Sequence, residues 1–157
     1  MDLPSGARVG TGSTRRVALL RSHRPDPELV ALRGNVPTRL SRPESGELDA
    51  VILACSGLDP LRLADTTGAS PSTATLLPAV GQGLLVLETR ADDEWRPRIE
   101  SLEDPEIGSV ARAERAYQSA LGGDCSIPMA GFAERRSGGE LRLRGLVASL
   151  DGVTLAS

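Results

Sequence analysis

Short apolar runs alternate with helix-like stretches through the first half of the chain. Residues 8–10, 29–32 and 50–54 are typical of strands, and the last run is continuously apolar, as in a strand buried on both faces. A helical pattern follows each run, at residues 14–22, 36–42 and 56–64. This β–α repetition predicts a parallel α/β sheet, whose ligand sites lie beyond the carboxyl ends of its strands.

The second half of the chain has a different pattern of predicted elements. Residues 65–76 resemble a linker and residues 83–89 a further buried strand. Two helices are then predicted at 92–102, with Trp95, Ile99 and Leu102 on one face, and at 107–121. Alternating strands at 129–133, 141–148 and 152–156 follow, joined by glycine-containing turns. This tail is α+β, so we expect two domains bridged by residues 77–104.

Composition narrows the range of partners. The formal net charge is −3, which argues against a nucleic-acid binder, and aromatic residues at 2% offer no platform for stacked bases. No apolar run approaches the length of about 20 residues that crosses a bilayer, and the N-terminus lacks a signal-peptide pattern. A cytoplasmic protein without a membrane partner is therefore expected. With one histidine and two cysteines, a metal cluster is not expected either.

All 18 basic residues are arginine. Arginine suits bidentate recognition of carboxylates, although a coding bias that also enriches alanine, glycine and proline explains the general excess as well. The first particular cluster lies in the strand-to-helix turn Gly10-Thr11-Gly12-Ser13-Thr14-Arg15-Arg16. Helix N-terminal amides, the Ser13 hydroxyl and two guanidinium groups would favour an anion there. A capped surface helix with solvated arginines is the alternative.

A second cluster is Leu32-Arg33-Gly34-Asn35-Val36-Pro37-Thr38-Arg39. Arg33 ends a predicted strand and Arg39 lies about one turn into the next helix. Because parallel strands end at the same sheet edge, both should lie near the first cluster, where together they would suit a ligand with several carboxylates. Ordinary surface arginines remain an alternative.

The two cysteines have different surroundings in the sequence. Cys125 lies in Gly122-Gly123-Asp124-Cys125-Ser126-Ile127-Pro128, a glycine-rich loop after a helix, which would expose its thiol. Cys55 continues the apolar run 51–54 and is expected to be a small buried hydrophobe. A structural cysteine at position 125 remains an alternative.

These stretches together resemble the hydroxymethylbilane synthase (porphobilinogen deaminase) family. The matching strings, in order, are residues 10–16, 32–40, 49–58, Leu77-Pro78-Ala79-Val80-Gly81-Gln82-Gly83, Ala113-Glu114-Arg115 and 122–128. The resemblance implies two periplasmic-binding-like α/β domains and a small α+β domain. On that basis residues 1–76 are most of the second α/β domain, 77–104 a crossover and returning segment of the first, and 105–157 the start of the third.

The resemblance also implies a reaction. Family members join four porphobilinogen units head to tail with loss of ammonia, starting from a dipyrromethane cofactor held by a thioether, here on Cys125. Each pyrrole carries an acetate and a propionate, so the growing chain is a polyanion. The residues implied to hold these carboxylates are Ser13, Arg15, Arg16, Arg33 and Arg39, with Gln82 and Arg62 as further candidates. The full-length enzyme is expected to be a monomer.

The sequence departs from the family pattern in several places. Arg62 stands two residues after Pro60, which occupies the place of a further cleft arginine, and Asp124 precedes the cysteine where glycine is common. Pro43 interrupts a stretch that is usually helical. The segment that carries the family's catalytic aspartate has no counterpart here. The chain is therefore expected to be a fragment that is inactive alone, and a non-catalytic polycarboxylate-binding remnant is the alternative function.

Overall fold

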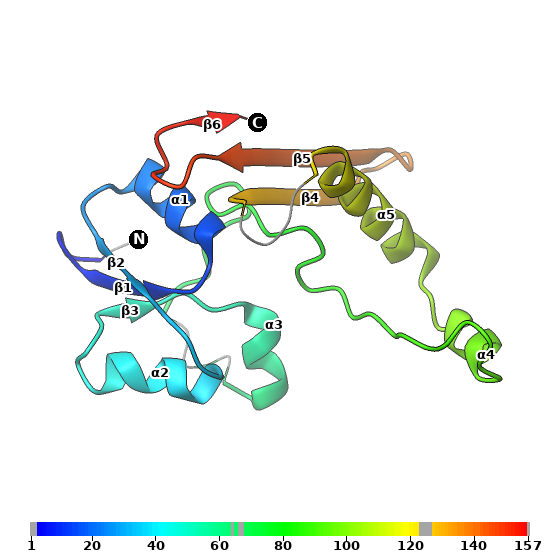
Figure 1. Ribbon diagram of the computed structural model, residues 1–157, viewed down its shortest axis with the longest axis horizontal. Coiled ribbons are helices and arrows are strands. Elements are labelled where there is room, and N and C mark those ends of the chain that lie inside the picture. Colours follow the sequence, from blue (N-terminus) through cyan, green and yellow to red (C-terminus); the bar gives the residue numbers. More distant parts are fainter. Residues whose placement is uncertain (1–2, 64, 66–67, 123–126, 157) are drawn as a thin grey trace.

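The computed structural model describes residues 3–63, 65, 68–122 and 127–156, which form two three-stranded sheets. The first sheet is parallel with strand order β2-β1-β3, and the second has the order β4-β5-β6. Figure 1 shows the second sheet lying above helix α1 of the first unit, with helix α5 along its far part. The parallel sheet with its interleaved helices confirms the predicted α/β class for the first half.

The parallel sheet is built around a central strand. β1 (Arg8–Thr11) pairs with β2 (Glu28–Ala31) on one side and with the short β3 (Ala50–Val51) on the other. Val9 of β1 is 1% exposed and is the centre of the core. The core is completed by Ala7 and Leu20, with Leu3, Leu29, Ala50 and Ile52 packed against it.

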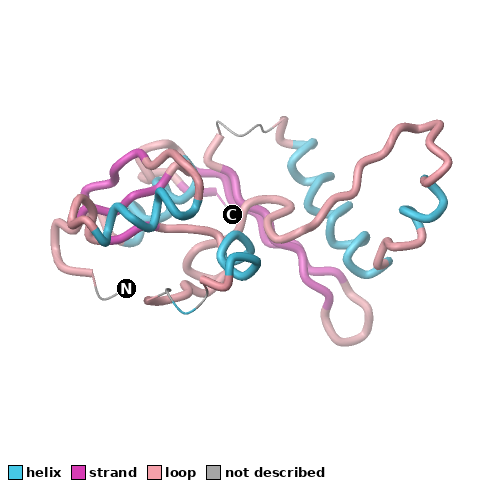
Figure 2. The backbone as a smooth tube through the Cα atoms, turned by 90° about the horizontal axis from the view of Figure 1, so that it is seen from below, coloured by secondary structure: helices cyan, strands magenta, loops and turns pink. Residues whose placement is uncertain are grey.

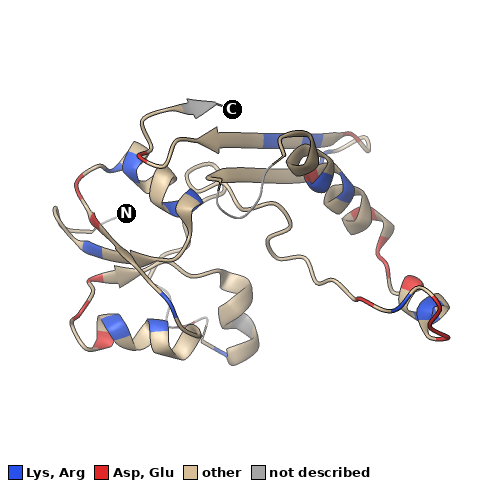
Figure 3. Ribbon diagram, viewed as in Figure 1, with Lys and Arg blue, Asp and Glu red and all other residues tan. Residues whose placement is uncertain are grey.

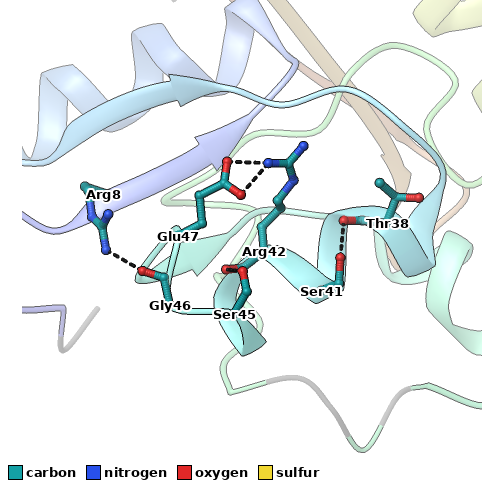
Figure 4. A network of polar contacts seen from close by, with 7 residues as sticks. All are labelled: Arg8, Thr38, Ser41, Arg42, Ser45, Gly46 and Glu47. Atoms are coloured by element: carbon teal, nitrogen blue, oxygen red, sulfur yellow. Dashed lines mark hydrogen bonds and ion pairs between the residues drawn. The ribbon is translucent and has the colours of Figure 1, made fainter.

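The two longer helices of this unit begin at side-chain caps. Ser13 caps α1 (Thr14–His23) and Asn35 caps α2 (Val36–Glu44), each by accepting a hydrogen bond from an amide three residues on. The helix predicted at 36–42 continues two residues further, to Glu44, so Pro43 lies inside it and does not interrupt it. Figure 4 shows how its end is fixed: Arg42 pairs with Glu47, and Arg8 Nη2 donates to the Gly46 carbonyl over 2.8 Å.

The second sheet is an antiparallel meander. β4 (Met129–Arg135) pairs with β5 (Leu141–Ala148), which pairs with β6 (Leu155–Ala156). Helix α5 (Pro105–Ala120), capped by Asp104, packs across β4 and β5. Its Tyr117 ring lies so close to Gly145 that a Cβ there would stand 2.5 Å from it, so the glycine allows the helix to approach the sheet. The α+β tail is confirmed.

The predicted buried strand at 83–89 is wrong in this structure. These residues form no strand, and the side chains of Leu85, Val86 and Leu87 are 99%, 79% and 61% exposed. Within the described residues, no backbone–backbone hydrogen bond involves residues 85–89. A strand requires a neighbour that supplies its ladder, and no described segment lies beside this one. Figure 2 shows the loop standing away from both sheets in a second view.

Four further elements are shorter than predicted. The strand expected at 152–156 is reduced to β6 (Leu155–Ala156). The apolar run 50–54 gives only the two-residue, half-buried β3, because it pairs with β1 alone at the sheet edge. The helix expected at 56–64 divides into α3 (Cys55–Leu58) and a 3₁₀ turn that contains Pro60. The helix expected at 92–102 is reduced to α4 (Arg96–Glu100), since its apolar face has nothing to pack on and Trp95 and Leu102 are exposed.

No helix among the described residues combines the length and the apolar character that crossing a bilayer requires.

Candidate functional site

The site begins at the turn between β1 and α1. The strand leads through Thr11 and Gly12 into Ser13, whose Oγ accepts a hydrogen bond of 3.3 Å from the Arg16 amide. This cap starts α1, so that Arg15 and Arg16 lie in its first turn. Both guanidinium groups are therefore held at the carboxyl edge of the parallel sheet, where the sequence predicted an anion site.

The end of β2 lies directly beside this turn. A Cβ on Gly12 would stand 2.6 Å from the Leu32 carbonyl oxygen, so only glycine permits this approach. Gly34 then turns the chain with a φ of 108°, in the left-handed region that favours glycine. Arg39 Nε donates to the Gly34 carbonyl over 2.7 Å, which fixes this side chain near the same edge. Figure 3 shows basic segments at the start of α1 and the end of β2.

A pocket with a volume of about 650 Å³ opens between these elements. It brings together six of the residues predicted from the sequence: Ser13, Arg15, Arg16, Arg33, Arg39 and Gln82. Gln82 comes from the segment Leu77–Gln82, here named the crossover strip, which is distant in sequence from the other five. The pocket therefore joins two neighbouring strand ends with the crossover strip.

Arg15 is the buried member of the set, with 5% of its surface exposed. Its Nη1 donates to the Leu77 carbonyl oxygen, and its Nη2 donates to Gln82 Oε1 over 3.3 Å. Burial lowers the pKa of Arg15 to about 10, and the neighbouring charge of Arg16 acts in the same direction. Arg15 is still protonated at neutral pH, and the crossover strip determines where its guanidinium group lies.

Arg16 is partly buried and incompletely paired. Its Nη1 donates to the Ile52 carbonyl over 2.8 Å, while its buried Nε has no hydrogen-bond partner in the structure. Burial lowers the pKa of Arg16, and so, to a smaller extent, does the charge of Arg39. A ligand oxygen that accepted from this Nε would remove the cost of an unsatisfied buried donor.

The pocket has no acidic counterpart. None of the described residues that line it is Asp or Glu, and no ion pair among the described residues involves Arg15, Arg16, Arg33 or Arg39. Crowded guanidinium groups without carboxylate partners repel one another, and this repulsion adds to burial, the larger cause, in lowering the pKa values of Arg15 and Arg16. A ligand with several negative charges relieves that repulsion, so the geometry suits a polyanion.

Two further residues singled out in the sequence, Arg62 and Cys55, do not line the pocket. Arg62 is exposed, has a left-handed φ of 56° after Pro60, and does not line the pocket. Cys125 lies outside the described residues. The expectation that Cys55 is buried is wrong: its thiol is exposed because β3 ends at Val51 and the chain turns into α3 at Cys55 itself.

Two features of the site were missed from the sequence. Leu150, from the turn after β5, lines the pocket, and its carbonyl accepts from Arg21 Nη1 of α1 over 3.2 Å. Glu114 of α5 is 4% exposed and reaches the crossover strip, where its Oε2 accepts from the Gly81 amide over 2.7 Å. The sequence signal that could have pointed to Glu114 is its place on the buried face of the helix, where a carboxylate is unusual. Leu150 gave none.

Comparisons with known proteins agree with this site. The family model described as porphobilinogen deaminase, dipyromethane cofactor binding domain, matches residues 1–97, and the model of the porphobilinogen deaminase C-terminal domain matches residues 109–156. The site residues at the carboxyl edge and Gln82 fall within the first match.

Curated relatives carry the same name. The chain is 45% identical to a porphobilinogen deaminase of Syntrophus aciditrophicus over 98% of its length and 50% of the relative's. It is 46% identical to one of Roseiflexus sp. over 96% of the chain and 50% of the relative, and 47% identical to one of Sphingopyxis alaskensis over 96% and 48%. The chain thus spans about half the length of these relatives. With its first 97 residues matched by one family model and most of the rest by another, the chain belongs to the porphobilinogen deaminase family.

Proposed function

We propose that this chain supplies the cofactor- and substrate-holding part of a hydroxymethylbilane synthase. The enzyme would join four porphobilinogen units head to tail, with release of ammonia, in tetrapyrrole biosynthesis. The observation that carries this proposal is the convergence of Arg15, Arg16, Arg33 and Arg39 on one pocket free of acidic residues among those described. Each porphobilinogen has two carboxylates, so a growing chain of pyrroles needs several fixed cations.

The residues present fit a dipyrromethane with its acetate and propionate groups. The unpaired Arg16 Nε and the exposed guanidinium group of Arg33 offer donors to carboxylate oxygens, and Ser13 adds a hydroxyl. When bound, the cofactor supplies the pyrrole carbon to which the first substrate is joined. Arg16, Arg33 and Arg39 would orient its carboxylates, while Arg15, held by the crossover strip, would contribute a fixed positive charge.

The domain organisation is part of the proposal. Residues 1–76 would be most of a periplasmic-binding-like α/β domain, 77–104 a crossover and returning segment of another such domain, and 105–157 the start of the C-terminal α+β domain. The parallel order β2-β1-β3 supports the first assignment, and the change to an antiparallel meander after α5 supports the last. The apolar but unpaired residues 85–87 are those expected of a strand that belongs to a further sheet.

Cofactor attachment gives a direct test. Cys125 would carry the dipyrromethane through a thioether, so protein produced in cells that make porphobilinogen should gain the mass of two pyrrole units on the peptide that contains Cys125. Cys125→Ala should abolish the adduct. Cys55→Ala is the matched control, because Cys55 is an exposed thiol whose removal should leave the adduct intact.

The alternative function is a remnant that binds polycarboxylates without catalysis. It shares the arginine pocket and differs in the covalent step. Binding of free pyrrole carboxylates without any adduct on Cys125 would favour the remnant, and an adduct on Cys55 would contradict the proposed cofactor site.

A further inference from the structure

Glu114 is a buried carboxylate without a cationic partner. It is 4% exposed, and no ion pair among the described residues includes it. Both of its oxygens instead accept hydrogen bonds from backbone amides: Oε2 from Gly81 over 2.7 Å and Oε1 from Ala133 over 2.8 Å. Burying a carboxylate is costly unless its oxygens are satisfied, so these two amides fix the side chain closely.

The two amides belong to different parts of the molecule. Ala133 lies in β4, whereas Gly81 lies in the crossover strip. A second bond holds the same pair of segments together, since the Gly131 amide donates to the Pro78 carbonyl over 3.1 Å. A Cβ on Gly131 would stand 2.8 Å from Val80, so the strip lies directly on the strand. Glu114 thus fastens the strip to β4 and α5.

The other side of the crossover strip faces the pocket. Leu77 and Gln82 accept from the two terminal nitrogens of Arg15, and Gln82 is the residue next to Gly81. Glu114 is therefore connected to the buried guanidinium group in two steps: it accepts from the Gly81 amide, and the side chain of the next residue, Gln82, accepts from Arg15. The hydrogen bonds of Glu114 go to Gly81 and Ala133 and not to Arg15.

We propose that Glu114 is a positioning residue for polycarboxylate binding, which acts by fixing the crossover strip that orients Arg15 in the pocket. The inference rests on the proposed function for the identity of the ligand, but not for the geometry. It assigns to the α+β unit, through α5 and β4, a share in the affinity of a pocket whose four arginines all come from the α/β unit.

The first test reads the position of Arg15 without a ligand. In the 157-residue chain, ¹⁵N-edited NMR should show slow rotation and slow solvent exchange for the Arg15 guanidinium group. Glu114→Gln keeps one acceptor and places an amide donor against a backbone donor, so it should release this group while leaving that of Arg39 unchanged. Glu106→Gln, an exposed glutamate on the same helix, is the matched control. A freely exchanging Arg15 in the unmodified chain would overturn the inference even if Glu114→Gln did not fold.

The second test reads affinity by calorimetry with pyromellitate, a rigid ring that carries four carboxylates. Glu114→Gln should weaken binding by roughly tenfold, the loss of one charge-assisted contact. In an Arg15→Lys background it should cause little further loss, because both changes remove the same oriented guanidinium group. Additive losses, or a lowered melting temperature with unchanged affinity, would show a merely structural role and overturn the inference. Failure of the unmodified chain to bind pyromellitate would contradict the proposed function instead, and the NMR result would still decide the positioning role.

Discussion

Arg15 Nη2 donates a hydrogen bond of 3.3 Å to Gln82 Oε1, although 67 positions separate the two residues in the sequence. The arginine starts a helix of the α/β unit, and the glutamine belongs to the crossover strip that lies on β4 of the α+β unit. One wall of the arginine pocket therefore depends on the contact between the units. Substitutions in either unit should therefore change the affinity of this pocket for a polyanion.

Arg33→Lys should weaken binding of a pyrrole polycarboxylate by roughly ten- to a hundredfold, or about 1.5–3 kcal/mol. Lysine keeps the charge but loses the planar fork that holds a carboxylate through two bonds. Calorimetry with a dipyrromethane that bears acetate and propionate groups measures the change. Arg135→Lys is the control, since Arg135 is exposed at the end of β4 and does not line the pocket. Equal losses at both positions would contradict the assignment of Arg33.

Gly12→Ala should destabilise the chain and displace the pocket. The added Cβ would meet the Leu32 carbonyl at 2.6 Å, so either the turn after β1 or the end of β2 must move. We expect a loss of about 1–3 kcal/mol in the free energy of unfolding by urea, together with weaker polyanion binding. Gly57→Ala places its Cβ 3.6 Å from Val36, an ordinary contact, and should leave both quantities nearly unchanged. A neutral Gly12→Ala would mean that the two strand ends are not this close.

Polyanion affinity should fall as the pH rises through about 10, because Arg15 then loses its charge in the folded chain. The effect on folding has the opposite sign. Because the folded-state pKa of Arg15 lies below the ordinary value for arginine, the unfolded chain binds more protons above pH 10, and the contribution of Arg15 to stability increases with pH. Titration calorimetry at a series of alkaline pH values tests the first statement. The drop should disappear in Arg15→Gln, and its persistence there would assign it to another group.

Residues 85–87 should promote self-association of the chain. Their side chains are apolar and exposed, and among the described residues no backbone–backbone hydrogen bond involves residues 85–89. The backbone of a second copy can therefore pair with this segment. Val86→Glu should reduce the aggregated fraction in size-exclusion chromatography. Val153→Glu is the control, because Val153 is 82% exposed but lies in a turn. Strong hydrogen-exchange protection of residues 85–87 in a monomer would contradict this prediction.

The sequence was most informative where local signals and packing agree. Ser13 marked the start of α1, and the short apolar run at 8–10 marked the strand β1, whose Val9 is buried. The shared edge of parallel strands was enough to predict that Arg16, Arg33 and Arg39 would line one pocket.

Local signals were insufficient where an element depends on a distant neighbour. The run at residues 83–89 has strand propensity, but no described strand pairs with it, so it forms none. Cys55 was expected to be buried by continuity with an apolar run, whereas the helix that begins at Cys55 exposes its thiol. The role of Glu114 could not be predicted because the amides it binds, at Gly81 and Ala133, are set by tertiary packing.

The exposure of residues 85–87 also has a consequence for the continuity of the chain. A single proteolytic cut at these exposed residues would leave two pieces that still contact each other. The crossover strip of the first piece lies on β4 of the second, Arg144 Nη2 donates to Thr73 Oγ1 over 2.9 Å, and Arg21 donates to the Leu150 carbonyl. None of these contacts needs the peptide bonds between residues 85 and 87. We therefore expect the nicked protein to remain a noncovalent heterodimer, held together in part by the crossover strip, which also forms one wall of the arginine pocket.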